Sequence, residues 1–179
     1  MIWSNYNPTA IYAGPGARRL LASLVPGGKL LLVTSEGMVR RGVAEALTAL
    51  CPDNAWEVRT VAPNPDLDML DDAAHALRDE RVTAVVALGG GSAMDSGKAL
   101  AAILPMPGER PLSQWLRGVA PRPDVPVLPL FCLPTTAGTG AEVTPFGTIW
   151  DMAQGKKRSV AHDALYPQAA ILDPELTLS

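Results

Sequence analysis

The sequence predicts an α/β fold, in which a doubly wound and mostly parallel sheet carries helices on both faces. Two observations support this prediction. Continuous apolar runs alternate with segments of helical periodicity, and such runs are typical of parallel strands that are covered on both faces. In addition, two glycine-rich segments directly follow apolar runs, and doubly wound folds bind their ligands beyond the carboxyl ends of the strands.

The first half of the chain contains three strand–helix pairs. The expected strands are residues 29–34, 56–61 and 84–88, and the expected helices are residues 38–50, 66–78 and 93–104. In the second helix Leu67, Leu70 and Ala74 recur at helical spacing, and Asp66 stands where an N-cap residue is needed. This alternation gives the doubly wound order.

The second half of the chain is less regular. The prolines between Pro105 and Pro129 predict an irregular surface connection over about residues 105–126. Apolar runs then return and predict strands at residues 127–133, 147–150 and 169–172. A hairpin before a basic turn at Lys156-Lys157-Arg158 is one arrangement open to these strands.

Length and composition narrow the classes of protein. With 179 residues, 47% apolar and 18% charged, the chain suits one globular domain over residues 1–179. The net charge is −3 and the one basic cluster is short, so we expect neither nucleic acid nor a membrane surface as a partner. The start lacks the pattern of a signal peptide, and Cys51 and Cys132 lie far apart, which favours the cytoplasm.

The segment Gly89–Lys98 predicts an anion site. It follows the apolar run 84–88 and opens the expected helix 93–104. A strand that ends in glycines and starts a helix exposes backbone N–H groups at the positive end of the helix dipole, where phosphate binds well. The segment 134–144 ends another apolar run and adds four threonine hydroxyls and two glycines. Together the two segments predict a site for a phosphorylated cofactor.

These segments closely resemble the iron-containing, or group III, alcohol dehydrogenases, in the superfamily that includes dehydroquinate synthase. The matching segments are Tyr12–Gly16, Pro63–Pro65, Gly89–Lys98, Pro134–Thr144 and Ile171–Leu176. The resemblance implies a Rossmann-like domain in an enzyme that oxidises alcohols or reduces aldehydes with NAD(P)H and a divalent metal, iron or sometimes zinc. It also implies small alcohol or aldehyde substrates, and it leaves a homodimer open.

The resemblance assigns roles to ten positions. Gly90, Gly91 and Ser92 would hold the pyrophosphate, and Asp95 would point into the cofactor site. Thr135, Thr136 and Thr139 would contact the adenine and phosphate side, Asn64 the ribose or nucleotide edge, and Lys157 the nicotinamide ribose. The tenth position is Ser35, where many NAD-specific members carry an aspartate that repels a 2′-phosphate. Without that carboxylate, and with Glu36 as a partial substitute, we expect use of NADP(H) or of both cofactors.

Several of these positions have structural alternatives. Asp95 could complement the helix dipole, Asn64 could be a turn residue, and Lys157 could be a solvated charge. Thr135 and Thr136 could form a turn at the end of a strand. Lys98 is expected to face solvent or to pack its stem rather than to touch a ligand.

The metal ligands of the family lie in a helical domain that follows the segment Asp173–Leu176, and the resemblance therefore implies that this chain contains none of them. Neither His75, in an expected solvent-facing position of a helix, nor His162 has the spacing of a metal site. The isolated chain is accordingly expected to be inactive. Two other classes remain open, a stand-alone nucleotide-binding module or pseudoenzyme and an NAD-using lyase of the dehydroquinate synthase type.

Overall fold

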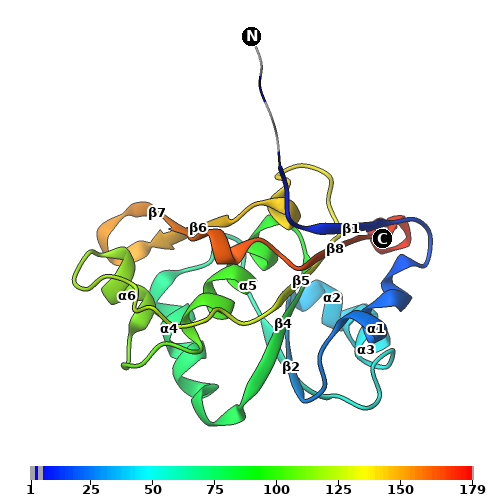
Figure 1. Cartoon of the computed structure of the whole chain (residues 1–179), viewed down its shortest axis with the longest axis horizontal. Helices are drawn as coiled ribbons and strands as arrows, with labels where there is room; N and C mark the ends of the chain where they lie inside the picture. Colours follow the sequence, from blue (N-terminus) through cyan, green and yellow to red (C-terminus); the bar gives the residue numbers. More distant parts are fainter. Residues whose placement is uncertain (1–2, 4–5, 179) are drawn as a thin grey trace.

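A computed structural model describes residues 3 and 6–178 and has an α/β architecture around one parallel sheet (Figure 1). In the described part of the chain, six strands follow the order β1-β8-β5-β4-β2-β3, and each neighbouring pair is parallel. The strands are β1 (Ala10–Ala13), β2 (Lys29–Thr34), β3 (Ala55–Thr60), β4 (Val82–Gly89), β5 (Leu130–Pro134) and β8 (Ala169–Leu172). The predicted fold class is confirmed.

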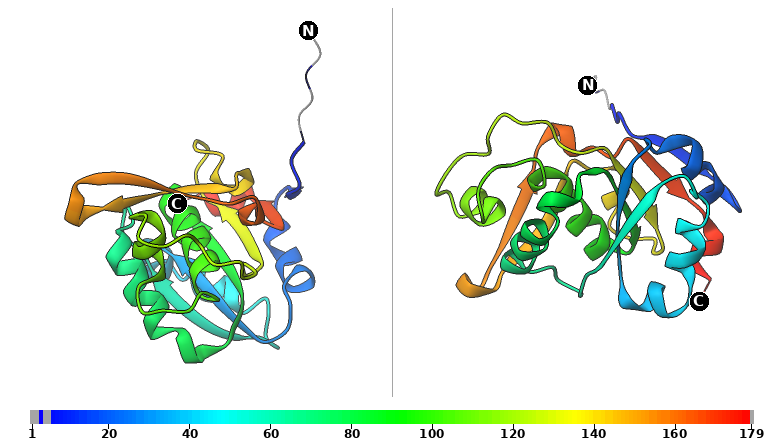
Figure 2. Two further views of the ribbon diagram at one scale, coloured as in Figure 1. Left: turned by 60° about the vertical axis from the view of Figure 1, so that its left-hand side comes forward. Right: turned by 90° about the horizontal axis from the view of Figure 1, so that it is seen from below.

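Helices cover both faces of the sheet (Figure 2). They are α1 (Leu21–Leu24), α2 (Glu36–Arg40), α3 (Val43–Thr48), α4 (Leu67–Ala76), α5 (Gly91–Ile103) and α6 (Pro111–Leu116). Alternate strand residues divide the core in two. Leu31 and Val33 join the cluster that contains residues of α4, α5 and α6, whereas Leu30 and Leu32 join the cluster with residues of α1, α2 and α3. Successive side chains of β2 point to opposite faces of the sheet, so this strand contributes residues to both hydrophobic clusters.

Several predicted elements are confirmed. The strand predicted at residues 29–34 coincides with β2, and α4 begins after the predicted N-cap. The Asp66 carboxylate accepts hydrogen bonds from the backbone N–H groups of Asp68 and Met69, at 3.1 Å each. These two donors belong to the first turn of the helix and would otherwise lack a partner.

The prediction of one continuous helix over residues 38–50 is wrong, because the structure has two helices there, α2 and α3. The break lies at Gly42, whose φ of 72° is left-handed and serves as the start of α3. Glycine adopts this conformation without the steric cost that a Cβ atom would bring. The periodicity of the apolar residues continues across the break, and for that reason it suggested a single helix.

The connection predicted over residues 105–126 contains a helix, α6, which the local sequence pattern does not predict. Its start is capped from α4: the buried Asp71 carboxylate accepts hydrogen bonds from the N–H groups of Leu112 and Ser113, at 2.8 and 3.0 Å. Pro111 stands at the first position of the helix, where its missing N–H costs nothing. The cap comes from a residue about forty positions earlier in the chain, beyond the reach of a local pattern.

A separate antiparallel hairpin consists of β6 (Phe146–Asp151) and β7 (Lys156–Ala161). Lys156, Lys157 and Arg158 therefore begin a strand, and the prediction of a basic turn at these residues is wrong. The turn itself lies just before them and ends at Gly155.

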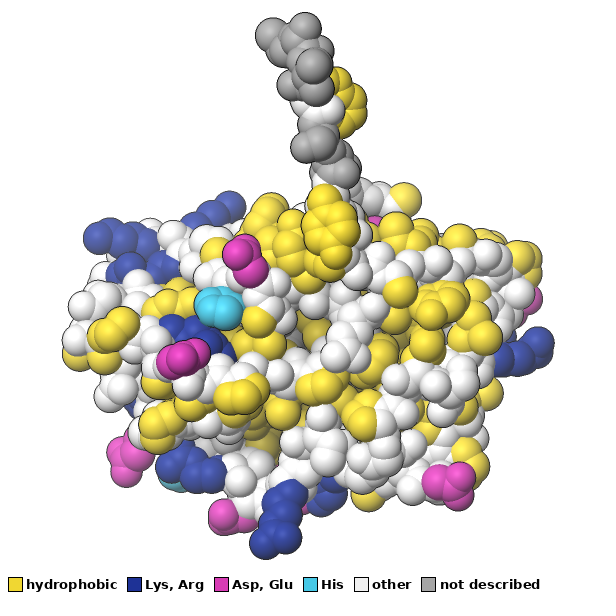
Figure 3. Space-filling view, in the orientation of Figure 1, with side chains coloured by type: hydrophobic (Ala, Val, Ile, Leu, Met, Phe, Trp, Pro, Cys, Tyr) yellow, Lys and Arg dark blue, Asp and Glu magenta, His cyan; other side chains and the backbone are white. Residues whose placement is uncertain are grey.

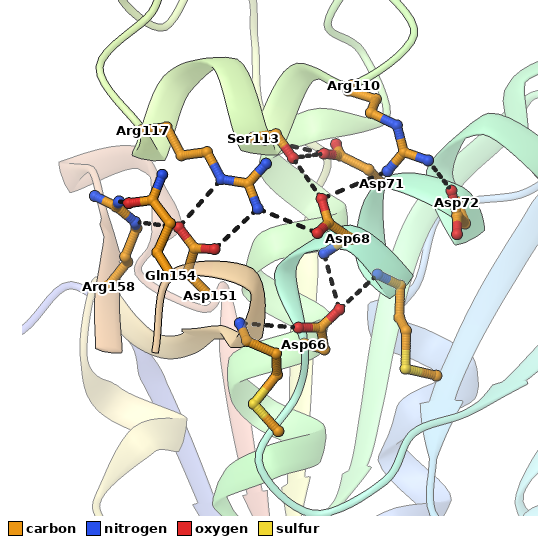
Figure 4. Close-up of polar contacts among 12 residues, drawn as sticks. Asp66, Asp68, Asp71, Asp72, Arg110, Ser113, Arg117, Asp151, Gln154 and Arg158 are labelled. Carbon is orange, nitrogen blue, oxygen red and sulfur yellow. Dashed lines mark hydrogen bonds and ion pairs between the residues drawn. The ribbon is translucent and has the colours of Figure 1, made fainter. Parts of the chain in front are cut away.

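The hairpin is fastened to α4 and α6 by a network of ion pairs (Figure 4). Its centre is the Asp151 carboxylate, which has no exposed side-chain surface. This carboxylate accepts hydrogen bonds from Arg117 at 2.9 Å and from Arg158 at 2.8 Å. Arg117 also pairs with Asp68 of α4 at 3.1 Å, so the network joins all three elements.

Within the described residues, no helix combines the length and the apolar character that crossing a bilayer requires. Figure 3 shows one face of the molecule, on which Lys and Arg side chains are scattered toward the periphery rather than gathered into one patch.

Candidate cofactor site

Four neighbouring strands end at one edge of the sheet, and predicted site residues follow each of them. Ser35 follows β2, Asn64 lies beyond β3, Gly90 follows β4 and Thr135 follows β5. The chain passes from β2 outward to β3 and then returns to β4 on the other side of β2. This change of direction is the topological switch point at which doubly wound folds bind ligands.

The two glycine-rich segments lie side by side at this edge. The Thr135 N–H donates to the Gly89 carbonyl at 2.9 Å. A Cβ atom at Gly90 would lie 3.3 Å from the Thr136 hydroxyl, and one at Gly91 would lie 3.2 Å from a Thr139 methyl. The lack of a side chain at Gly90 and Gly91 therefore lets the segment 134–144 pack closely against the start of α5.

The start of α5 has the properties of an anion site. Its N-cap, Gly90, provides no side-chain hydrogen bond, and within the described chain the N–H groups of Gly91 and Ser92 have no protein acceptor. Gly89 has a φ of 148°, and a Cβ atom there would lie 2.9 Å from the Ala93 Cβ, so glycine is required at this turn. Two free donors at the positive end of a thirteen-residue helix fit a phosphate group.

Asn64 is brought into the same region by the loop after β3. Its N–H donates to the Ser92 hydroxyl at 3.3 Å, and its φ of 59° is one of two left-handed values among the described non-glycine residues. Asn64 is exposed to solvent. Thus Asn64 occupies a turn, as predicted, and also lies beside the start of α5.

Asp95 lies one turn into α5, half-buried against the hairpin. A Cβ atom at Gly147 of β6 would lie 3.0 Å from the Asp95 Oδ1, so only glycine fits opposite this carboxylate. Burial raises the pKa of Asp95, and a backbone hydrogen bond from Thr148 partly offsets that rise. The structure therefore places Asp95 between the glycine-rich turn and β6.

Ser35 lines a groove of about 420 Å³ beside the loop after β3, together with Thr60 and Pro63. Its hydroxyl caps α2 by accepting from the Met38 N–H at 3.4 Å. The neighbouring Glu36 is exposed and forms a pair with Arg40 at 3.7 Å. The residue that follows β2 thus carries a hydroxyl, that of Ser35. The carboxylate of the next residue, Glu36, is paired with Arg40 on the exposed side of α2.

Lys157 takes no part in the contacts described between the two glycine-rich segments. This residue is exposed on β7, and its Nζ lies 4.7 Å from the centroid of the Trp150 ring. Such an arrangement is a cation–π contact.

Of the two alternatives expected for Lys98, exposure to solvent and packing of its stem, the structure contradicts the first. Lys98 is fully buried, and its ammonium donates to the Thr144 hydroxyl at 2.9 Å and to the Phe146 carbonyl at 2.7 Å. One pattern in the sequence places Lys98 on the same side of the helix as two predicted site residues. Gly91, Asp95 and Lys98 are spaced i, i+4 and i+7 and therefore share one face of α5.

The described residues do not fit a metal site. Among residues 3 and 6–178, no three or more His, Cys, Asp or Glu side chains are grouped so that they could hold a metal ion. His75 and His162 are both exposed, and the His162 Nδ1 accepts a hydrogen bond from the Ala164 N–H at 3.1 Å.

Comparison with known proteins gives a consistent set of relatives. Residues 8–174 match the model of the family described as iron-containing alcohol dehydrogenase. The chain is 29% identical to the NADH-dependent butanol dehydrogenase A of Clostridium acetobutylicum over 178 residues. It is 36% identical to the phosphonoacetaldehyde reductase of Streptomyces viridochromogenes over 172 residues.

Among solved structures, the sulfoacetaldehyde reductase of Bifidobacterium kashiwanohense in complex with NAD+ superposes with a TM-score of 0.89 at 35% identity. That match covers 100% of this chain and 48% of the reductase. The chain covers 45% of the butanol dehydrogenase and 41% of the phosphonoacetaldehyde reductase, so it spans about half the length of these relatives or less. By the match over residues 8–174, the chain belongs to the iron-containing alcohol dehydrogenase family.

Proposed function

We propose that residues 1–179 form the cofactor-binding domain of an NAD(P)-dependent, metal-assisted alcohol dehydrogenase or aldehyde reductase. The observation that carries the proposal is the meeting of the two glycine-rich segments at the start of α5, where the N–H groups of Gly91 and Ser92 have no acceptor in the described chain. The NAD+ complex of the sulfoacetaldehyde reductase, a relative with 35% identity, supports it.

In this proposal the backbone of Gly90 and Gly91 and the Ser92 hydroxyl hold the pyrophosphate. The α5 dipole favours its negative charge, and the lack of side chains lets it approach closely. Thr135, Thr136 and Thr139 line the adenine and phosphate side. A cavity of about 260 Å³, lined by Thr136, Pro134 and Leu172 among others, adjoins these threonines and offers an apolar wall to a base.

The remaining site residues orient the cofactor. Asn64 and Asp95 flank the pyrophosphate segment, and Lys157 would reach the nicotinamide ribose from the hairpin. When bound, the nicotinamide exchanges a hydride with a small alcohol or aldehyde. The protein's part is to fix the orientation of the ring and to keep the pyrophosphate in a preorganised set of donors.

No catalytic step through a metal is assigned to the described residues, because they do not form a site that fits one. We therefore expect the 179-residue chain to bind the cofactor without turning over alcohols or aldehydes. The small substrate, a cytoplasmic location and a homodimer belong to the same proposal. A stand-alone nucleotide-binding module, which needs only the anion site at the start of α5, is the second candidate. The family match favours the dehydrogenase over the lyase class.

The test is calorimetric titration of the chain with NADPH and with NADH. Saturable binding that Asp95→Ala weakens at least about tenfold is expected, because this variant removes an acceptor for the hydroxyl and amide groups of the cofactor from the site into which Asp95 is proposed to point. Glu80→Ala, which removes a carboxylate at the opposite end of the sheet, is the matched control. A folded chain that binds neither dinucleotide would contradict the proposal.

Cofactor preference is tested by Ser35→Asp. The new carboxylate would repel a 2′-phosphate and accept from ribose hydroxyls, so we expect the ratio of NADPH to NADH affinity to fall at least about tenfold. An unchanged ratio would show that the groove at Ser35 does not hold the adenosine ribose. Product formation by the isolated chain from butanol or an aldehyde would refute the expected inactivity.

A further inference from the structure

The buried ammonium of Lys98 donates its hydrogen bonds to Thr144 and Phe146, neither of which is proposed to bind the cofactor. We propose that Lys98 is a positioning residue, which holds the connection between β5 and β6 against α5 and thereby fixes one wall of the cofactor site. This wall is the segment 139–148. The inference rests on the proposed function for its effect on cofactor affinity, whereas its effect on the segment itself can be tested without any ligand.

Three contacts along one face of α5 seat this segment. At the first turn, Gly91 lies against Thr139, with 3.2 Å between a Cβ atom at the glycine and the threonine methyl. One turn later Asp95 packs against Gly147. After a further turn Lys98 donates to Thr144 and to the Phe146 carbonyl. The segment thus lines this face of α5 from Gly91 to Lys98.

Lys98 supplies the directional part of this contact. The Thr144 hydroxyl, which accepts from Lys98, lies 3.5 Å from the Ala141 carbonyl. A chain of polar contacts therefore runs from the ammonium back to the short helical turn Ala141–Val143, which directly follows Thr139 and Gly140. Thr136 and Thr139 are themselves exposed, so anchorage of this wall depends on residues farther along the segment.

The cost of burying the ammonium argues against a role in stability alone. Burial lowers the pKa of Lys98, and Cys132, Asp95 and Glu142, which face it from β5, α5 and the segment, partly oppose this. An unbranched apolar side chain would fill the same space without the desolvation penalty. What it would not provide is two hydrogen bonds of fixed direction to Thr144 and Phe146, and directed bonds hold a loop in one place.

The experiment compares Lys98→Met with the native chain by amide hydrogen exchange without ligand and by calorimetry with NADPH and NADH. We expect exchange over residues 139–148 to accelerate at least about tenfold while β2 and β4 stay protected, and both dissociation constants to rise at least about tenfold. Lys29→Met removes the same charge at the amino end of β2 and is expected to change neither measurement.

A second pair of variants covers the case in which Lys98→Met does not fold. Thr144→Val removes the acceptor of the ammonium and is expected to accelerate exchange in the segment and to weaken binding. Thr144→Ser keeps the hydroxyl and is expected to behave as the native chain. This pair separates loss of the hydrogen bond from loss of side-chain volume.

Two results would overturn the inference. Unchanged exchange over residues 139–148 in Lys98→Met, or in Thr144→Val if the first variant does not fold, would show that Lys98 does not hold the segment. Faster exchange with dissociation constants that stay within about twofold would show a purely structural role. If the native chain binds neither dinucleotide, the proposed function fails and the part of the inference that concerns cofactor affinity fails with it, whereas exchange still decides whether Lys98 holds the segment.

Discussion

The close packing of α5 on β4 leads to a prediction whose sign depends on two opposing effects. Gly97 lies inside α5, and a Cβ atom there would lie 2.9 Å from the Cβ of Ala87 on β4. Ordinary carbon contacts are about 3.5–4.0 Å. The substitution Gly97→Ala therefore requires α5 to move about 0.6 Å or more away from the sheet. Neither partner has a flexible end that could move instead, since both atoms are fixed to the backbone.

The magnitudes decide against the alanine. Glycine is about 1 kcal/mol less favourable than alanine inside a helix, and burial of one methyl group contributes about 0.8 kcal/mol. Overpacking in a well-packed core costs about 1–3 kcal/mol, and the rigid contact with Ala87 places this site at the upper end. We expect a net destabilisation of about 1 kcal/mol, which lowers Tm by about 2–4 °C in a chain of this size.

Equilibrium unfolding in urea, followed by circular dichroism, measures the difference. Ser96→Ala is the matched control on the same helix. The Ser96 hydroxyl is buried and has no hydrogen-bond partner among the described residues, so its removal is expected to be neutral or stabilising. A Gly97→Ala chain that is more stable than the native one would refute the reasoning, because helix propensity would then outweigh the contact with β4.

Two further predictions concern buried carboxylates. Asp173 accepts hydrogen bonds from the N–H groups of Gly16, Arg18 and Glu175 and from the Arg18 guanidinium. Burial raises the pKa of Asp173, but these hydrogen bonds together lower it by a larger amount. The net shift of the pKa is therefore downward. The stability that they contribute is therefore present above about pH 4 and lost as the pH falls through the folded-state pKa. We expect Asp173→Asn to cost about 2 kcal/mol at pH 7 and to flatten the acid limb of the stability curve measured in urea; an unchanged limb would contradict this. Arg117→Met should lower the urea midpoint more than Arg110→Met, because Arg117 pairs with the fully buried Asp151 and Arg110 with the exposed Asp72. Equal midpoints for the two variants would contradict a larger contribution from the pair with the buried Asp151 in Figure 4.

Local patterns were sufficient where a segment is determined by its own residues. The apolar run 29–34 predicted β2 because both of its faces are buried, and Asp66 predicted the start of α4 because an N-cap bonds within its own turn. Both glycine-rich segments were found in the same way, since their backbone requirements are local. The parallel order then brought them to one edge of the sheet.

Other features depend on residues distant in the chain. The start of α6 is fixed by Asp71 of α4, and Lys156–Arg158 extend as a strand because β6 pairs with them and Asp151 binds Arg158. The burial of Lys98 depends on acceptors in the segment after β5. Strand β1 was not predicted either; it is short and pairs only with β8 at the other end of the sequence.

The pairing of β1 with β8 also has a consequence for the order of folding. Ala10 lies opposite Ala169, so β1 finds its partner only when the chain is available as far as residue 169. Contacts of such wide sequence separation slow folding, because the entropy of closing the intervening chain must be lost before the contact is gained. During synthesis, when residues emerge from the amino terminus onward, the segment 10–13 must remain unpaired until residue 169 has left the ribosome. Strand β1 is therefore the first strand of the described residues to be synthesised and among the last of them to be paired.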